Sequence, residues 1–131
     1  MAVITKLERA VFALMGEDHP AIAERLARFV ASATVTQRQN TGHGFYTTFE
    51  VDTRQRTLQS GRGPVDGPLL DVQVGHQVLT MGFLLWLTDG HPSCLEGFQY
   101  GTVAGGHVDL KEVDLNSLDS LGRLPPTLRL Q

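Results

Sequence analysis

The chain has 131 residues, a hydrophobic content of 41% and a formal net charge of −3, which together predict one soluble domain with a single core. The absence of a net basic charge argues against duplex nucleic acid as a ligand. Charged residues make up 19% of the chain, less than the usual figure of about 25%, so part of the surface is expected to be neutral and suited to self-association or to a partner.

The N-terminal third predicts two amphipathic helices. The first stops near Gly16, and its apolar residues follow the i, i+3, i+4, i+7 spacing of a helix: Leu7, Ala10, Val11 and Leu14. The second begins with Asp18 as a cap and Pro20 in its first turn. Its apolar stripe consists of Ile22, Leu26, Phe29 and Val30.

From residue 33 the pattern changes to that of strands. The stretches "ATVTQRQ" (33–39) and "FYTTFEV" (45–51) alternate and are rich in β-branched or aromatic residues. The turn cluster "NTGHG" lies between them, so we expect a hairpin that pairs Val35–Arg38 with Phe45–Val51. In the second strand, one face should carry Phe45, Thr47, Phe49 and Val51, and the other Tyr46, Thr48 and Glu50.

The next segment, 52–68, is crowded with glycine and proline, which excludes regular structure. It carries Arg54, Arg56 and Arg62, and it can be interpreted as an arm for an anionic partner or as a solvated loop. We favour the solvated loop, because Asp52 and Asp66 dilute the positive charge.

Residues 69–100 supply the remaining strands. Asp89-Gly90 suits a tight hairpin turn, since both positions tolerate positive φ, although Pro92 makes a longer or bulged loop equally plausible. Further on, "HVDLKEV" (107–113) predicts a short strand. One or two helical turns should follow, capped by Asp114 or Asn116, stopped by Gly122 and built on Leu115, Leu118 and Leu121.

These elements predict an α+β fold over residues 1–131, as a single domain with two N-terminal helices on one face of an antiparallel sheet of about four to six strands. The run Phe83–Leu87 is apolar at odd and even positions, so both of its faces should be covered. The helices cover one face. The other requires a second subunit, which we favour as a homodimer, or the C-terminal leucines Leu110, Leu115, Leu118 and Leu121.

Two blocks, "QRQNTGHGFYTTFEV" and "GFLLWLTDGHPSCLEGFQY", resemble a family of small uncharacterised bacterial proteins. These carry a Thr-Gly-x-Gly-Phe turn after a strand, and then a hairpin that ends in Leu-Glu-Gly-Phe or Tyr-x-Tyr. The resemblance covers roughly Leu7 to Tyr100 and provides no activity. It implies that Gly42, Gly44, Glu96 and Gly97 matter, and proteins of this kind often have toxin-immunity or other partner-binding roles.

The residues that could carry chemistry are sparse. The five histidines lack metal-ligand spacing, although His76 and His91 lie near strand ends and could converge. A nucleophile at Cys94, served by His91 or His43, is disfavoured because a free cysteine in a strand usually fills space. No phosphate loop or dinucleotide motif is present. We therefore expect no catalytic residue, no metal and no cofactor.

The compartment follows from the single cysteine, which fits a reducing environment. The N-terminal segment has charged residues among its apolar ones and lacks a secretory core, and the run Met81–Leu87 is too short to cross a membrane. A cytoplasmic protein without membrane attachment is the expectation.

Glu96 is the remaining candidate. An isolated carboxylate in a sheet usually meets a cation, so we interpret Glu96 as a structural acid paired with Arg38, or else with Arg9, Arg25 or Arg28. The second interpretation is a ligand-binding group beside the "NTGHG" turn.

The sequence as a whole favours a non-enzymatic protein that binds another macromolecule, immunity proteins being one example. The alternative is a small-ligand-binding protein or minor enzyme with a pocket around Arg38, His43 and Glu96. The glycines expected to shape turns in either case are Gly42, Gly44, Gly90 and Gly97.

Overall fold

The computed structural model describes residues 3–59, 63–102 and 106–123. The helical elements within them are α1 (Lys6–Asp18), η1 (Pro20–Ile22), α2 (Ala23–Ser32) and η2 (Leu115–Ser117). The strands are β1 (Val35–Asn40), β2 (Gly44–Phe49), β3 (Val65–Asp66), β4 (Leu70–Val74), β5 (Gln77–Thr88), β6 (His91–Thr102) and β7 (Asp119–Arg123).

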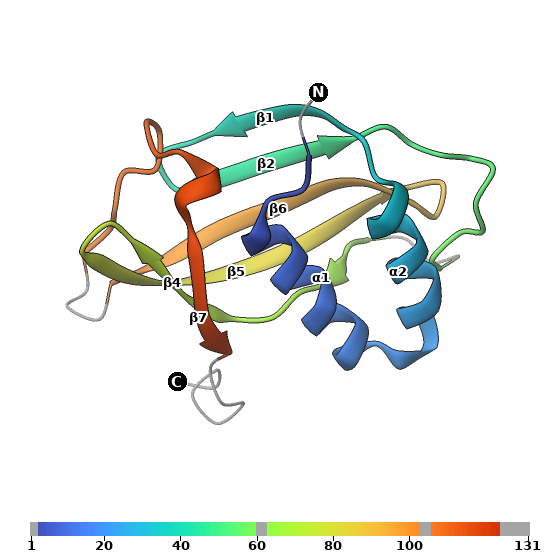
Figure 1. Ribbon diagram of the computed structural model, residues 1–131, viewed down its shortest axis with the longest axis horizontal. Coiled ribbons are helices and arrows are strands. Elements are labelled where there is room, and N and C mark those ends of the chain that lie inside the picture. The colour runs from blue at the N-terminus through green and yellow to red at the C-terminus, as the bar shows by residue number, and fades with distance from the viewer. Residues whose placement is uncertain (1–2, 60–62, 103–105, 124–131) are drawn as a thin grey trace.

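The predicted α+β class is confirmed: both helices lie against one face of an antiparallel sheet (Figure 1). The strand order is β1-β2-β6-β5-β4-β7, and β3 pairs with β5 beyond the end of β4. The sheet has 7 strands among the described residues, more than the four to six expected. The difference includes β3, a two-residue strand inside the segment that was expected to lack regular structure.

The helices form where the apolar spacing predicts them, but their boundaries differ. α1 continues past Gly16 to Asp18. His19, rather than Asp18, is the N-cap of the next turn, and Pro20 is its first residue. A 3₁₀ turn therefore joins the two helices, because Pro20 fits a first turn but cannot continue α1.

The two hairpins confirm the strand pairing. Arg38 lies opposite Thr47 in the first hairpin, with one register shift after Val35. In the second, Thr88 pairs with His91 around a two-residue turn in which Asp89 and Gly90 have φ of 50° and 84°. A bulge next to Trp86 accompanies this tight turn, so features of both proposed loops are present.

The C-terminal segment differs most from expectation. Residues 107–113 form no strand. Instead, the side-chain amide of Asn40 donates to the backbone carbonyls of Leu110 and Val113, at 3.1 and 2.6 Å. Asp114 caps η2 as expected, but the chain then enters β7, so Leu121 lies in a strand and not in a helical turn. Side-chain amides thus replace the backbone ladder that a strand would have needed.

The core lies between the helices and the sheet. Phe12, Phe29 and Phe49 form an aromatic cluster there, with ring centroids 5.1 to 6.0 Å apart. Leu110, Leu115 and Leu118 join this same core. These three leucines therefore add to the helix side of the sheet, whereas Leu121 is 54% exposed. None of the described helices is long and apolar enough to cross a membrane.

Candidate functional site

The side of the sheet turned away from α1 and α2, which we call the outer face, carries an aromatic patch. Alternation along the strands places successive side chains on opposite faces, and direct pairing sets Tyr46 and Leu84 on either side of Glu96. The patch consists of Tyr46, Leu84, Trp86, Glu96, Phe98 and Tyr100.

Glu96 lies at the centre of the patch and holds two of its rings. The Trp86 Nε1–H donates to Glu96 Oε1 at 3.0 Å, and the Tyr46 hydroxyl donates to Glu96 Oε2 at 3.3 Å. The charge of Glu96, followed by burial, raises the pKa of the Tyr46 phenol. One carboxylate therefore orients an indole and a phenol from two different strands.

The rings are open to solvent even though they lie in the middle of a sheet. Trp86 is 41% exposed, Tyr46 38% and Tyr100 62%. Phe98 packs edge-on against Tyr100 with centroids 5.7 Å apart. Both rings cover Gly82, where an added Cβ would lie only 2.8 Å from the Phe98 ring. The missing side chain at Gly82 thus allows the rings to lie on the sheet.

The Asp, Glu, Lys and Arg side chains on the outer face of strands β2 to β6 are all acidic. Strands β2 to β6 contain no lysine or arginine. Asp66 and Asp71 pair with Leu84 and Thr80, which places both carboxylates on the same face as Glu96. The outer face therefore combines aromatic rings with negative charge.

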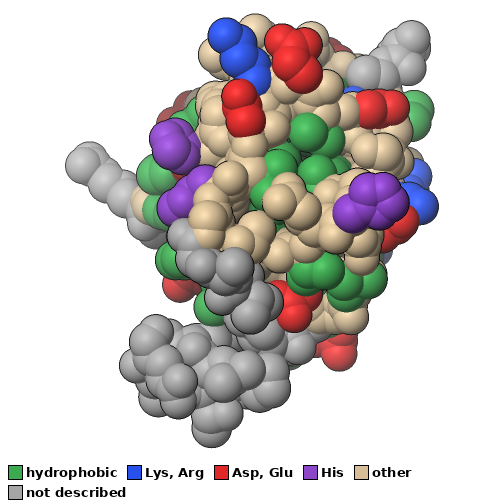
Figure 2. Space-filling view, turned by 90° about the vertical axis from the view of Figure 1, so that its left-hand side faces the viewer, with side chains coloured by type: hydrophobic (Ala, Val, Ile, Leu, Met, Phe, Trp, Pro, Cys, Tyr) green, Lys and Arg blue, Asp and Glu red, His purple; other side chains and the backbone are tan. Residues whose placement is uncertain are grey.

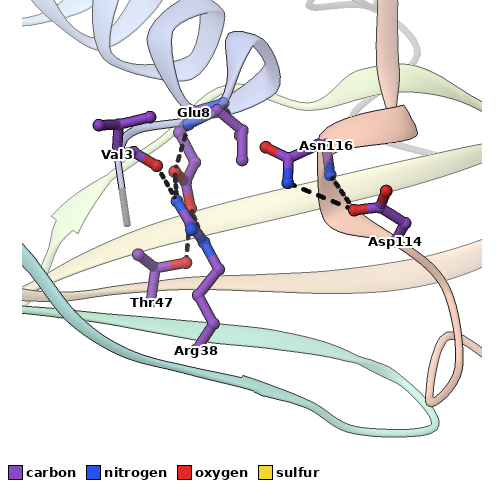
Figure 3. Close-up of polar contacts among 7 residues, drawn as sticks. Val3, Glu8, Arg38, Thr47, Asp114 and Asn116 are labelled. Carbon is purple, nitrogen blue, oxygen red and sulfur yellow. Dashed lines mark hydrogen bonds and ion pairs between the residues drawn. The ribbon is translucent and has the colours of Figure 1, made fainter. Parts of the chain in front are cut away.

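The expected pairing of Glu96 with Arg38 is wrong, because the two residues belong to opposite faces. Arg38 lies opposite Thr47, which faces the helices, whereas Glu96 lies opposite Tyr46. The partner of Arg38 is Glu8, with its Nη2 2.7 Å from Glu8 Oε1. Figure 3 shows Arg38 reaching toward both Glu8 and the carbonyl of Val3.

Glu8 is the buried structural acid of this fold. Its side chain is 1% exposed and also accepts from the Thr47 hydroxyl at 2.5 Å and the Thr5 amide at 2.8 Å. Thr5 in turn accepts from the Glu8 amide, which completes a capping box. The sequence carries a signal for this role, since Thr-x-x-Glu before an apolar run marks a helix start.

The glycines of the resembling blocks have different roles. A Cβ at Gly44 would lie 1.9 Å from the Gly97 carbonyl oxygen, and one at Gly97 would lie 2.6 Å from the Phe45 ring. At Gly42 the nearest atom would be 3.7 Å away, an ordinary contact. Close approach of β2 to β6 therefore requires Gly44 and Gly97, whereas space at Gly42 permits a side chain.

His43 lies in the exposed turn between β1 and β2, away from Glu96. Its ring meets that of His107 edge-on, with centroids 6.1 Å apart. Figure 2 shows this end of the molecule, where several histidine side chains are exposed. His76 follows β4 at this end, whereas His91 begins β6 at the other end of β5, so the two do not converge. The described residues include no group of three side chains placed to bind a metal.

Cys94 is a half-buried thiol on the outer face. Burial raises its pKa, so the thiol is protonated at neutral pH. A nucleophilic cysteine needs the opposite shift.

The best-formed hollows of the described surface have linings that do not include Arg38, His43 or Glu96. Arg38 and Glu96 lie on opposite faces of the sheet, so these two residues do not line one pocket. One of these hollows lies between α2 and residues 54–56 and is rich in arginine. Arg62, the third arginine of the predicted arm, falls outside the described residues.

Searches of family models, curated proteins and solved structures returned no match to this chain.

Proposed function

We propose that this chain is a non-enzymatic protein-binding domain, and that the aromatic patch of the outer face is its binding surface. The observation that supports this is a set of exposed rings, two of them held in place by Glu96. Tryptophan and tyrosine are enriched among the residues that dominate interface energetics. Rings that are already oriented lose less entropy on binding than free ones do.

The charge of this face defines the kind of partner. Asp66, Asp71 and Glu96 are not balanced by any lysine or arginine in strands β2 to β6. A complementary surface presents lysine or arginine side chains among apolar ones. Such cations can lie over the faces of Trp86 and Tyr46 while Glu96 attracts them. The proposed partner is therefore a basic protein.

An immunity-like protein in a bacterial cytoplasm would fit this activity, with a basic toxin as the partner. Co-expression separates this role from general protein binding: the chain should protect cells from a toxin encoded by a neighbouring gene. If no neighbouring toxin is neutralised, the immunity role fails while protein binding stays testable.

The test compares variants of two exposed apolar residues. Tagged wild-type protein and the Trp86→Ala variant are used to recover partners from cells that carry the gene, with Val3→Ser as the control, since Val3 is 66% exposed and precedes α1. The recovered protein is purified and titrated by calorimetry. Trp86→Ala should weaken binding by about 2 kcal/mol or more, and Val3→Ser should leave it unchanged. Equal binding by all three proteins would exclude the outer face as the binding surface.

A further inference from the structure

A second surface of this acidic chain concentrates positive charge. The hollow between α2 and the following loop has a volume of about 570 Å³, within the range of small-molecule pockets. We call it the arginine hollow, and its lining residues are Ala21, Glu24, Arg25, Arg28, Arg54, Gln55 and Arg56. Four arginines face one glutamate there, in a chain whose net charge is −3.

The walls of the hollow are fixed to each other. Arg25 donates to the carbonyls of Thr57 and Ala21, both at 3.1 Å. The side-chain amide of Gln55 donates to the hydroxyl of Ser32, in the last turn of α2, at 2.8 Å. Beyond them, Leu58 is only 2% exposed, and its amide donates to the Gly90 carbonyl. The loop is thus anchored on α2, and the arginines do not depend on a ligand to bring them together.

The guanidinium groups differ in how far they are already engaged. Arg28 is paired with Glu24 at 2.8 Å, and Arg54 with Asp52 at 3.0 Å. Arg56 has no hydrogen bond or ion pair with any other described residue. Within the described part of the chain, the Arg56 donors are therefore open to a ligand, and Glu24 is the group that competes with a ligand for Arg28.

We propose that the arginine hollow binds a small phosphorylated molecule. A phosphate group carries a charge near −2 and three acceptor oxygens. Arginine forks bind such groups through paired hydrogen bonds, which is why arginine clusters recognise phosphate better than they recognise single charges. The hollow is larger than one phosphate, so the rest of the ligand has room between the arginines. The hollow is open to solvent, so binding should weaken as salt is added.

The experiment titrates the ¹⁵N-labelled full chain with inorganic pyrophosphate at constant ionic strength, following amide shifts by NMR. The expected result is a saturable set of shifts confined to residues 21–28 and 54–57. Acetate at the same ionic strength should give none. Arg56→Gln should weaken pyrophosphate binding about tenfold, corresponding to one lost charge-assisted interaction.

Two further variants make the test specific to this site. Glu24→Gln should tighten binding, because it removes the competing carboxylate and frees Arg28. Lys111→Gln removes the same charge as Arg56→Gln but lies in the segment at the other end of the molecule, so it should have no effect (Figure 1). Unsaturable or scattered shifts, or equal effects of Arg56→Gln and Lys111→Gln, would overturn the proposal. Tighter binding of a phosphoserine peptide than of pyrophosphate would overturn the assignment to a small molecule.

Discussion

At the scale of single residues, the carboxylate that stabilises this fold is Glu8. It is almost fully buried and shared by Arg38, Thr47 and Thr5. We expect Glu8→Ala to lower the free energy of unfolding by about 3 kcal/mol, because it leaves Arg38 without its buried partner. Denaturant titration measures this change.

A matched control is available on α2. Glu24 also pairs with an arginine, but both side chains are more than 70% exposed. Glu24→Ala should therefore change the stability by no more than about 0.5 kcal/mol. Similar losses for the two variants would mean that burial does not distinguish these ion pairs.

Glu96 should control the titration of Tyr46 instead of the stability of the core. Its charge raises the pKa of the Tyr46 phenol above the ordinary value of about 10. A raised pKa in the folded state means that this contribution to stability is complete below pH 10 and is lost as the pH rises beyond it. In Glu96→Gln the pKa of Tyr46 should return toward its ordinary value.

The measurement is phenolate absorbance during an alkaline titration. Tyr46 and Tyr100 are the two tyrosines of the chain, so Tyr100→Phe isolates the signal of Tyr46. The comparison is between Tyr100→Phe alone and Tyr100→Phe combined with Glu96→Gln. An identical midpoint in both proteins would show that the Glu96 charge does not act on Tyr46.

The residue scale is also where inference from the sequence was weakest. The strand pattern correctly placed Tyr46 on one face and Thr47 on the other. The partner of Arg38 was missed because pairing across 30 residues depends on how α1 packs, and no local pattern specifies that. Glu96 was favoured as the structural acid because it lies in a predicted strand, whereas the burial of Glu8 follows only from the packing of α1.

At the scale of elements, the contact between β2 and β6 depends on Gly44. A Cβ there would lie 1.9 Å from a backbone oxygen of β6, which no side-chain movement can relieve. We expect Gly44→Ala to cost about 3 kcal/mol or more, at the upper end of overpacking effects. Thermal or denaturant unfolding provides the measurement.

Gly42→Ala is the control for this substitution, because its Cβ would meet nothing closer than 3.7 Å. Both variants add the same methyl group within one turn. If Gly42→Ala destabilised the chain as much as Gly44→Ala, the cause would be the turn conformation, and the close approach of the strands would not explain it.

Helices and strands were predictable where the spacing of apolar residues was regular and the contacts were local. The helices, the first hairpin and the Asp89-Gly90 turn all belong to this class. Residues 107–113 were misjudged as a strand because their backbone is held by the side chains of Asn40 and Gln99, which come from other strands. The same limit applies to β7, whose pairing with β4 spans most of the second half of the chain.

At the scale of the whole molecule, the exposed aromatic rings of the outer face bear on the homodimer expected from the sequence. Leu110, Leu115 and Leu118 pack in the core on the helix side of the sheet. Leu121 is 54% exposed. A twofold dimer through this face would bring Asp66, Asp71 and Glu96 near the same carboxylates of the second subunit. We therefore propose a weak homodimer that strengthens as salt screens this repulsion.

Light scattering behind a sizing column, over a range of micromolar concentrations and at low and high salt, provides the measurement. The dimer fraction should rise with salt and fall in Trp86→Ala. A mass of 14.3 kDa under all conditions would rule out self-association and leave the outer face to a foreign partner.

The two-residue turn at Asp89-Gly90 also influences the order in which contacts form during folding. β5 and β6 are neighbours along the chain, and such a hairpin forms in about 1–10 μs, whereas Tyr46 and Glu96 are separated by 50 residues and meet only after a long loop has closed. Trp86 and Glu96 therefore come together early, and Tyr46 arrives later. During refolding, the fluorescence of the single tryptophan should report the hairpin before the rest of the sheet has assembled around it.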